Sequence, residues 1–189
     1  MLGIFTVFTQ AKGKIATQFV GVLYFFFYIF LALSNEYFGE VIIYAGLMIP
    51  IYIYGILHWL KNKDAKNNVV IVRRNLPKGE WLALGFGLPI LAAGMYFLLH
   101  ALNTAEVLMS TITFVALTLS VYLLARRMKI NQVAFLASDF SIGLLWLFAI
   151  LNGDLAIIPF CVTCFIYVVY DVYGLSEWTK LERRQKDRA

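Results

Sequence analysis

The basic residues of this chain fall into groups that long apolar stretches separate. All 16 Lys and Arg residues lie in four segments, 12–14, 61–78, 126–129 and 180–188. The polar turns that alternate with these groups contain no Lys or Arg, and they lie at 34–36, 100–106 and 152–154. In membrane proteins, Lys and Arg accumulate in cytoplasmic loops. The alternation therefore predicts a multi-pass membrane protein whose basic turns and C-terminus are cytoplasmic.

The composition indicates the same class. Of the 189 residues, 61% are hydrophobic and 14% are charged, whereas soluble domains average about 45–50% apolar and about 25% charged residues. The net charge of +5 does not indicate a nucleic-acid partner, because the basic residues flank apolar spans instead of forming one face. Cys161 and Cys164 have no second Cys pair and no nearby His. We therefore expect lipid- or core-facing thiols, with no metal site and no cofactor.

Six apolar stretches are long enough to predict membrane helices, since about 20 apolar residues cross a hydrocarbon core of about 30 Å. These predicted spans are 17–33, 39–60, 81–99, 107–124, 133–151 and 155–173. Met1–Thr9 is also apolar, but at about 1.5 Å per residue it covers only about half of the core. We therefore expect six to seven transmembrane helices, with the N-terminus outside only if this piece crosses.

Two segments of the chain resemble each other. A Y-G-x-x-x-W pattern occurs at 54–59 and again at 173–178, each time at the end of a predicted span. Two three-helix units that run in the same direction, with one extra span between them, would account for this repeat. Such repeats occur in transporters, with the substrate near the repeat interface. Because Trp concentrates at the headgroup level of membranes, we interpret Trp59 and Trp178 as interfacial anchors.

The repeat predicts the domain organisation of the chain. We expect a first three-helix bundle with a short first helix, a cytoplasmic linker, a linker transmembrane helix, a second three-helix bundle and a charged cytoplasmic tail. Their predicted bounds are 1–60, 61–80, 81–100, 101–178 and 179–189. The linker contains a short β-prone run, Val69–Val72.

An ordered set of motifs extends over nearly the whole chain. It comprises Lys12-Gly13-Lys14-Ile15, Gly39-Glu40-Val41, Tyr54-Gly55 with Trp59, Tyr122 to Arg127, Ser141-Ile142-Gly143, and Tyr173-Gly174 with Trp178. This set resembles the PnuC family of bacterial vitamin transporters, which carry nicotinamide riboside and, in some relatives, thiamine, riboflavin or nucleosides. The resemblance implies an all-α, SWEET-like fold of two parallel three-helix bundles and a linker helix. It also implies facilitated diffusion, trapping by a cytoplasmic kinase, and a homotrimer.

The chain departs from the family pattern at three points. Fewer residues than usual precede Lys12, so we expect a truncated first helix. The Trp- and Asn-bearing motif of the sixth family helix is replaced by Ala134–Asp139. Tyr24, Tyr44 and Tyr52 stand where the family members that carry nicotinamide riboside tend to have Asn or Gln. A changed set of buried hydrogen-bonding groups implies a changed substrate.

Two acidic residues inside the predicted spans are the strongest site candidates. Asp139 and Asp171 lie about 10 Å from the cytoplasmic ends of their spans, where a charge costs at least about 2.5–3.5 kcal/mol. No Lys or Arg lies at that depth. Their partner could be a cationic ligand, a proton or neighbouring hydroxyls, and Asp171 aligns with Tyr52 in the repeat. In a purely structural role, protonated carboxyls would instead bond Ser138, Ser141 or a tyrosine.

A flat heterocycle and a ribose also need stacking surfaces and hydrogen-bonding groups. The predicted substrate-binding set is therefore Asp171, Asp139, Tyr52, Ser138, Tyr24, Tyr44, Trp146, Tyr170 and Gln18. We expect no catalytic residues, because the two histidines, His58 and His100, are predicted to lie at opposite membrane faces.

Together these features predict a vitamin transporter of the bacterial cell membrane. Nicotinamide riboside is the first substrate candidate and thiamine the second. The sequence has no G-x-x-x-x-G-K-[ST] loop, so we expect passive transport without ATP. Two alternatives remain open: a proton-coupled symporter of a nucleoside or vitamin, in which Asp139 or Asp171 carries the proton, and a membrane assembly protein without a ligand.

Overall fold

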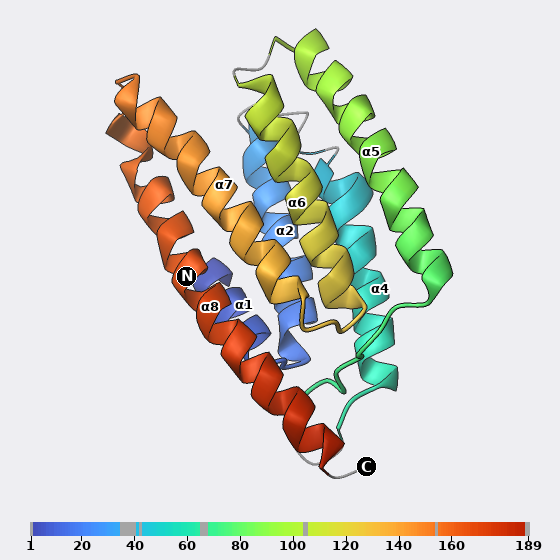
Figure 1. The fold of residues 1–189 in the computed structure, drawn as a ribbon. Coiled ribbons are helices and arrows are strands. Elements are labelled where there is room, and N and C mark those ends of the chain that lie inside the picture. Colours follow the sequence, from blue (N-terminus) through green and yellow to red (C-terminus); the bar gives the residue numbers. More distant parts are fainter. Residues whose placement is uncertain are drawn as a thin grey trace.

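The computed structural model of the chain is a bundle of helices (Figure 1). It describes residues 2–34, 41, 43–64, 68–103, 106–153 and 155–187. The elements in chain order are α1 (Leu2–Ala11), α2 (Ala16–Ser34), the π-helical turn η1 (Tyr44–Met48), α4 (Ile49–Lys61), α5 (Lys78–Ala101), α6 (Val107–Ala125), α7 (Asn131–Leu151), the 3-10 turn η2 (Leu155–Ile157) and α8 (Ile158–Lys186). Most of the predicted turn 34–36 and the first residues of the predicted span 39–60 lie outside the described residues.

Four of the described helices are long and apolar enough to cross a membrane. They are Lys78–Ala101, Val107–Ala125, Asn131–Leu151 and Leu155–Lys186, and α2 is apolar from Ala16 to Phe30. The prediction of an all-α membrane protein is thus confirmed. The π turn η1 directly precedes α4, which has Pro50 in its first turn. Since proline lacks an N–H and crowds the carbonyl four residues earlier, the wider turn lets the helix continue through it.

The helices form two halves that pack against each other. The first half comprises α1, α2, η1 and α4, and the second comprises α6, α7 and α8. Helix α1 packs on α2 and also on α8, while α4 packs on α2 and also on α6. The first helix of each half therefore contacts the third helix of the other half, as expected for two parallel repeats.

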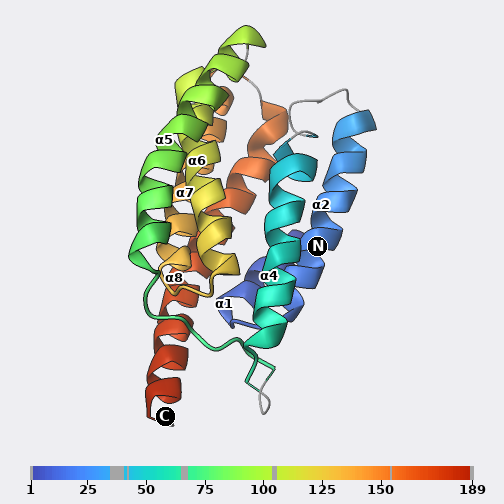
Figure 2. The same cartoon turned by 90° about the vertical axis from the view of Figure 1, so that its right-hand side faces the viewer.

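Helix α5 stands outside the two halves and contacts α6 (Figures 1 and 2). Along its whole length only Met95 is buried. Its large apolar side chains are exposed, among them Phe86, Ile90 and Phe97. Such a helix, apolar on every side, suits a lipid environment.

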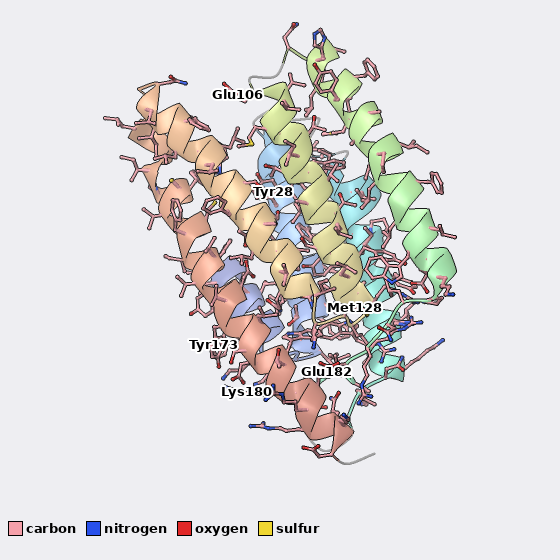
Figure 3. The ribbon with its side chains drawn as sticks, viewed as in Figure 1. Tyr28, Glu106, Met128, Tyr173, Lys180 and Glu182 are labelled. Atoms are coloured by element: carbon pink, nitrogen blue, oxygen red, sulfur yellow. The ribbon has the colours of Figure 1, made fainter. Side chains whose placement is uncertain are left out.

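The charged side chains gather at one end of the bundle, where Tyr173, Lys180 and Glu182 lie, and Glu106 lies at the opposite end (Figure 3). We refer to the end with Lys180 as the basic end. Residues 68–76, here named the strap, cross this end between α4 and α5 (Figure 2). Isolated β-bridges join Lys14 to Val69, Lys63 to Val70 and Arg73 to Met128, so the predicted β-prone run does pair locally.

The strap connects the two halves through its backbone. The N–H of Val70 donates to the carbonyl of Gly13 at 2.9 Å, and the N–H of Arg73 donates to the carbonyl of Arg127 at 3.0 Å. The side chain of Gln185, near the end of α8, bonds both the Val70 carbonyl and the Val72 N–H at 2.9 Å. The strap therefore holds three parts of the bundle in fixed relative positions: the turn that follows the first helix of each half, and the last turns of α8.

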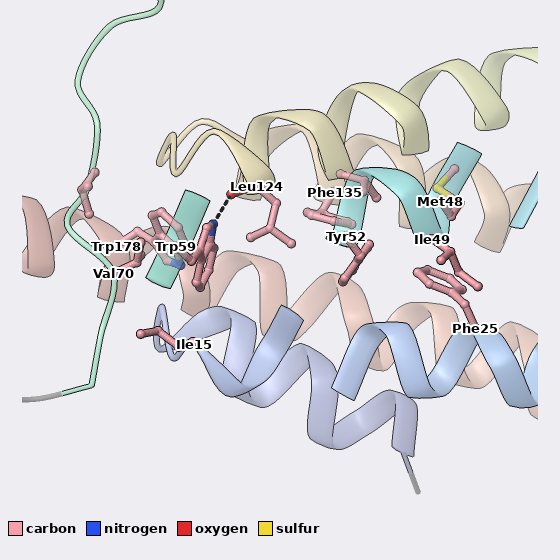
Figure 4. Close-up of a cluster of buried hydrophobic side chains, with 12 residues drawn as sticks. Ile15, Phe25, Met48, Ile49, Tyr52, Trp59, Val70, Leu124, Phe135 and Trp178 are labelled. Atoms are coloured by element: carbon pink, nitrogen blue, oxygen red, sulfur yellow. Dashed lines mark hydrogen bonds between the residues drawn. The ribbon is translucent and has the colours of Figure 1, made fainter. Parts of the chain in front are cut away.

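The interpretation of Trp59 and Trp178 as interfacial anchors is wrong. Both side chains have 0% exposure, and their rings meet edge to face at 6.1 Å. Trp59 Nε1 donates to the carbonyl of Leu124 at 3.0 Å, as Figure 4 shows, and Trp178 Nε1 donates to the carbonyl of Gln10 at 2.8 Å. The last carbonyls of a helix lack intrahelical donors, so each indole bonds the end of the other half's first helix.

Candidate functional site

In both halves the same turn joins the first helix to the second. Gly13 and Arg127 both have positive φ angles, 60° and 62°. The N–H of Lys14 bonds the carbonyl of Thr9 at 3.0 Å, and the N–H of Met128 bonds the carbonyl of Leu123 at 3.0 Å. Arg127 adopts the left-handed conformation that glycine adopts freely, and its guanidinium donates to the strap carbonyl of Ile71 at 2.9 Å. The structure therefore supports the repeat that the sequence indicated and extends it to the turns.

The glycines of the two Y-G-x-x-x-W motifs also have a shared role. A Cβ at Gly55 would overlap the amide of Gln18, and a Cβ at Gly174 would overlap the amide of Gln132. Both glutamines are buried, each with 1% exposure. Each motif thus leaves room for a glutamine from the second helix of its own half. Gln132 was not among the predicted site residues, although the repeat aligns it with Gln18.

Asp139 on α7 and Asp171 on α8 meet in the interior. Their side chains have 9% and 2% exposure, and the two carboxyls lie close enough together to interact. Asp171 Oδ2 has no hydrogen-bond partner among the described residues. Two carboxyls in contact can bond each other only when one of them carries a proton. This contact differs from the expected bonds to Ser138, Ser141 or a tyrosine.

Two tyrosines lie near the carboxyl pair, and a third lies beside one of them. Tyr52 on α4 is 4% exposed and lies close enough to Asp139 to be affected by its charge. The same is true of Tyr167 on α8, and the Tyr24 ring lies on the same side of Gly3 as Tyr167. A Cβ at Gly3 would overlap the Tyr167 hydroxyl, so the beginning of α1 lies against this tyrosine. Tyr167 was not in the predicted set, although its spacing of one helical turn from Asp171 could have indicated it.

The interior also holds polar atoms that no described residue bonds. Burying such an atom without a partner costs about 1–3 kcal/mol. Seven of these atoms lie on α2, α7 and α8, and three of the seven belong to the two glutamines of the repeat. The seven atoms are Thr17 Oγ1, Gln18 Oε1 and Nε2, Asn131 Oδ1, Gln132 Nε2, Ser138 Oγ and Asp171 Oδ2. These donors and acceptors could bond the hydroxyl and amide groups of a polar ligand.

Three predicted residues lie away from this cluster. Tyr44 on η1 stacks on Phe25 at 5.2 Å and contacts Tyr28 at 4.6 Å. Trp146 contacts Phe160 at 6.1 Å, about 10 Å along α7 from Asp139. Tyr170 neighbours Asp171 in sequence, so its side chain leaves α8 about 100° away from the carboxyl.

Two like-oriented three-helix halves, with unpaired polar groups and a carboxyl pair buried in the bundle, define a class of protein: the membrane transporters that are built from parallel repeats. Residues 1–180 match the family of the nicotinamide mononucleotide transporter, and the chain belongs to this family. The resemblance found in the sequence is thereby confirmed, as is the expectation of a transporter rather than an enzyme.

Two relatives support this assignment. The chain is 22% identical over 186 residues to the nicotinamide riboside transporter PnuC of Neisseria mucosa. The aligned region covers 96% of the chain and 70% of that protein. It is also similar to the crystal structure of the vitamin B3 transporter PnuC, with a TM-score of 0.77 and 21% identity over 97% of the chain and 80% of the solved one. The structural likeness shows the fold.

Proposed function

We propose that the chain carries nicotinamide riboside, or a closely related cationic vitamin such as thiamine, across the bacterial cell membrane. The observation that carries this proposal is the buried pair Asp139 and Asp171 near Tyr52 and Tyr167, with no Lys or Arg between residues 130 and 179 to neutralise it. A cationic ring satisfies both parts of this site. The carboxyls attract its charge, and the tyrosine faces stabilise a cation by about 0.5–2 kcal/mol.

Each part of the site has a matching part of the substrate. The nicotinamide ring stacks against Tyr52 and Tyr24, with its positive charge toward Asp171. The ribose hydroxyls bond the amide group of Gln18 and Nε2 of Gln132, atoms that otherwise lack hydrogen-bond partners within the described residues. Ser138, next to Asp139, adds a hydroxyl. Rocking of one half against the other opens the site to either side.

The orientation follows from charge. The basic end faces the cytoplasm, as the positive-inside rule requires, and the C-terminus is therefore cytoplasmic. Helix α5 faces the lipid bilayer. Transport is facilitated diffusion, and a cytoplasmic kinase retains the substrate as its phosphate. For the assembly we propose a homotrimer, on the family resemblance alone, and native mass spectrometry of the purified protein tests it.

The test is uptake of radiolabelled nicotinamide riboside and thiamine into proteoliposomes that contain the full chain. We expect saturable uptake of one of them, and loss of that uptake in Asp171→Asn. Asp187→Asn is the matched control, because it removes a carboxylate at the end of α8, outside the site. Absence of saturable flux for both vitamins would overturn the proposal, as would full activity of Asp171→Asn.

One observation favours a second candidate, a proton-coupled symporter. Asp139 and Asp171 lie close together, and a proton taken up between the two carboxyls could travel with the substrate. Proteoliposomes with an inward proton gradient would then accumulate substrate above the external concentration, and a protonophore would abolish this accumulation. With the membrane potential held at zero, facilitated diffusion gives equal concentrations on both sides with or without the gradient.

A further inference from the structure

At the basic end, α5 supplies a carboxylate to the second half. Glu80, in the first turn of α5, bonds the guanidinium of Arg126 and accepts a hydrogen bond from the Tyr122 hydroxyl at 3.0 Å. Arg126 Nη1 also donates to the Tyr54 hydroxyl at 2.6 Å and lies 3.3 Å from His58 Nε2. Burial opposes the charge of Arg126, but the bonds to Tyr54 and Glu80 outweigh it and raise the Arg126 pKa.

The repeat places an equivalent set of side chains at the other contact between the halves, where α1 meets α8. The matched turns at Gly13 and Arg127 align α1 with α6, and the matched glycines Gly55 and Gly174 align α4 with α8. Lys12 is therefore equivalent to Arg126, and Phe8 is equivalent to Tyr122. On the other helix, Tyr173 is equivalent to Tyr54, and Glu177 is equivalent to His58. The structure supports this alignment, because Lys12 Nζ lies over the Phe8 ring at 4.4 Å.

No residue equivalent to Glu80 lines this second place among the described residues, because α5 packs beside α6, on the other side of the bundle from α1 (Figure 2). A cavity of about 320 Å³ lies there, lined by Lys12, Lys14, Tyr173, Glu177 and Arg184, with Asp64 at its wall. Among the described residues, Lys12, Lys14 and Arg184 form no ion pair. Glu177 forms an ion pair with Lys180 at 2.8 Å, and this bond, with the more distant charges of Arg184 and Lys12, lowers the Glu177 pKa.

We propose that this cavity binds a phosphate group, which takes the place that the Glu80 carboxylate has in the other half. Three basic side chains can each donate to a phosphate oxygen, and such charge-assisted bonds are roughly twice as strong as neutral ones. The Tyr173 hydroxyl offers a further donor, as Tyr54 and Tyr122 do around Arg126 and Glu80. The volume exceeds the need of a carboxylate and admits a phosphate with part of the molecule that carries it.

The phosphate group has two sources that share this chemistry. A soluble phosphate monoester would reach the cavity from the water at the basic end. An anionic phospholipid would present its headgroup from the membrane surface, where basic residues next to a membrane helix attract such lipids. The proposal concerns binding and does not depend on which substrate the transporter carries.

The first arm of the test uses inorganic phosphate with the full chain in nanodiscs of phosphatidylcholine. We expect calorimetry at constant ionic strength to detect binding, and the double variant Lys12→Gln/Lys14→Gln to weaken it about tenfold or more. Lys61→Gln is the matched control, since this exposed lysine lies at the same end of the bundle but outside the cavity. The variants must show the thermal unfolding of the parent in phosphate-free buffer, and Arg184→Gln replaces the double variant if that one fails to fold.

The second arm uses nanodiscs of phosphatidylglycerol mixed with phosphatidylcholine. Native mass spectrometry then measures how much phosphatidylglycerol stays bound to each variant. Loss of binding in the first arm alone identifies a soluble phosphate compound, and loss of retained lipid in the second arm identifies a headgroup. If the parent and the double variant behave alike in both arms, the proposal is overturned.

Discussion

In the first half of the bundle, α2 and α4 meet through the rings of Phe25 and Tyr52, edge to face at 5.1 Å. In the second half, α7 and α8 meet through the carboxyls of Asp139 and Asp171 at the corresponding positions of the repeat. The turns, the motif glycines and the tryptophan bonds are shared by both halves. The backbone was therefore kept while the side chains diverged, so that one half supplies aromatic faces and the other supplies negative charge.

A second difference lies at the basic end. Arg126 has a carboxylate partner from α5, whereas its equivalent Lys12 borders a cavity. The two halves meet at two places, α4 with α6 and α1 with α8. Helix α5 lies beside the first of these places. A single linker helix thus makes two otherwise equivalent places chemically different.

The largest effect is expected when the second half is given the side chains of the first. In Asp139→Phe/Asp171→Tyr, uptake of the cationic vitamin should fall by about 100-fold or more, which corresponds to about 2.7 kcal/mol of lost interaction. The repeat already accommodates this aromatic pair between α2 and α4, so the protein should still fold. Proteoliposome uptake and thermal unfolding measure the two properties. Unchanged uptake would show that the difference between the halves has no part in transport.

The next effect concerns the glycines that the halves share. Valine at Gly55 or Gly174 must displace a buried glutamine, and overpacking of this kind costs about 1–3 kcal/mol. Gly174→Val should lower the Tm further, because the backbone of Ala11 also lies within 3.3 Å of a Cβ there. Gly94→Val on α5 is the control, since nothing lies within 4 Å of its Cβ. An equal Tm for all three variants would contradict the proposed packing.

A smaller effect should follow loss of the tryptophan bonds. Trp59→Phe and Trp178→Phe each remove one indole donor, at a net cost of about 1 kcal/mol. The carbonyls that accept these bonds also accept the backbone N–H groups of Arg127 and Gly13, so neither is left without a donor. The Tm of the two variants should therefore fall by similar amounts. A loss confined to one variant would show that the two contacts are not equivalent.

The smallest effect separates the two places at the basic end. Glu80→Gln removes the ion pair with Arg126, and because Glu80 is one-quarter exposed the cost should be about 0.5–1 kcal/mol. Lys12→Gln should lower the Tm less than Glu80→Gln in phosphate-free buffer, because Lys12 forms no ion pair with a described residue and loses only its contact with the Phe8 ring. A Tm loss as large as that of Glu80→Gln would show that the chain itself already supplies a charged partner for this lysine.

The sequence predicted the parts of the molecule that composition and periodicity determine. Apolar length located the helices, and the predicted span 107–124 differs from α6 by one residue. The Y-G-x-x-x-W pattern indicated the repeat, and its glycines proved to have equivalent contacts. The depth of Asp139 and Asp171 identified both as site candidates before their contact was known.

What the sequence could not predict depends on contacts between distant segments. Whether Asp139 meets Asp171 is decided by how α7 rotates against α8, and no local spacing encodes that rotation. Trp59 and Trp178 lie at the ends of predicted spans, where tryptophans often act as interfacial anchors. They are buried because each one packs against the first helix of the other half. Lys12 and Arg184 come from opposite ends of the chain, so the cavity between them has no local sequence pattern.

The central claim is that the carboxyl pair recognises the positive charge of the substrate. Its most direct test compares the Kd of nicotinamide riboside with that of its dihydro form, which has nearly the same shape but a neutral ring. We expect the parent to bind the cation about tenfold or more tightly, and Asp139→Asn/Asp171→Asn to bind both forms alike. Equal affinity of the parent for the charged and the neutral ring would contradict the account.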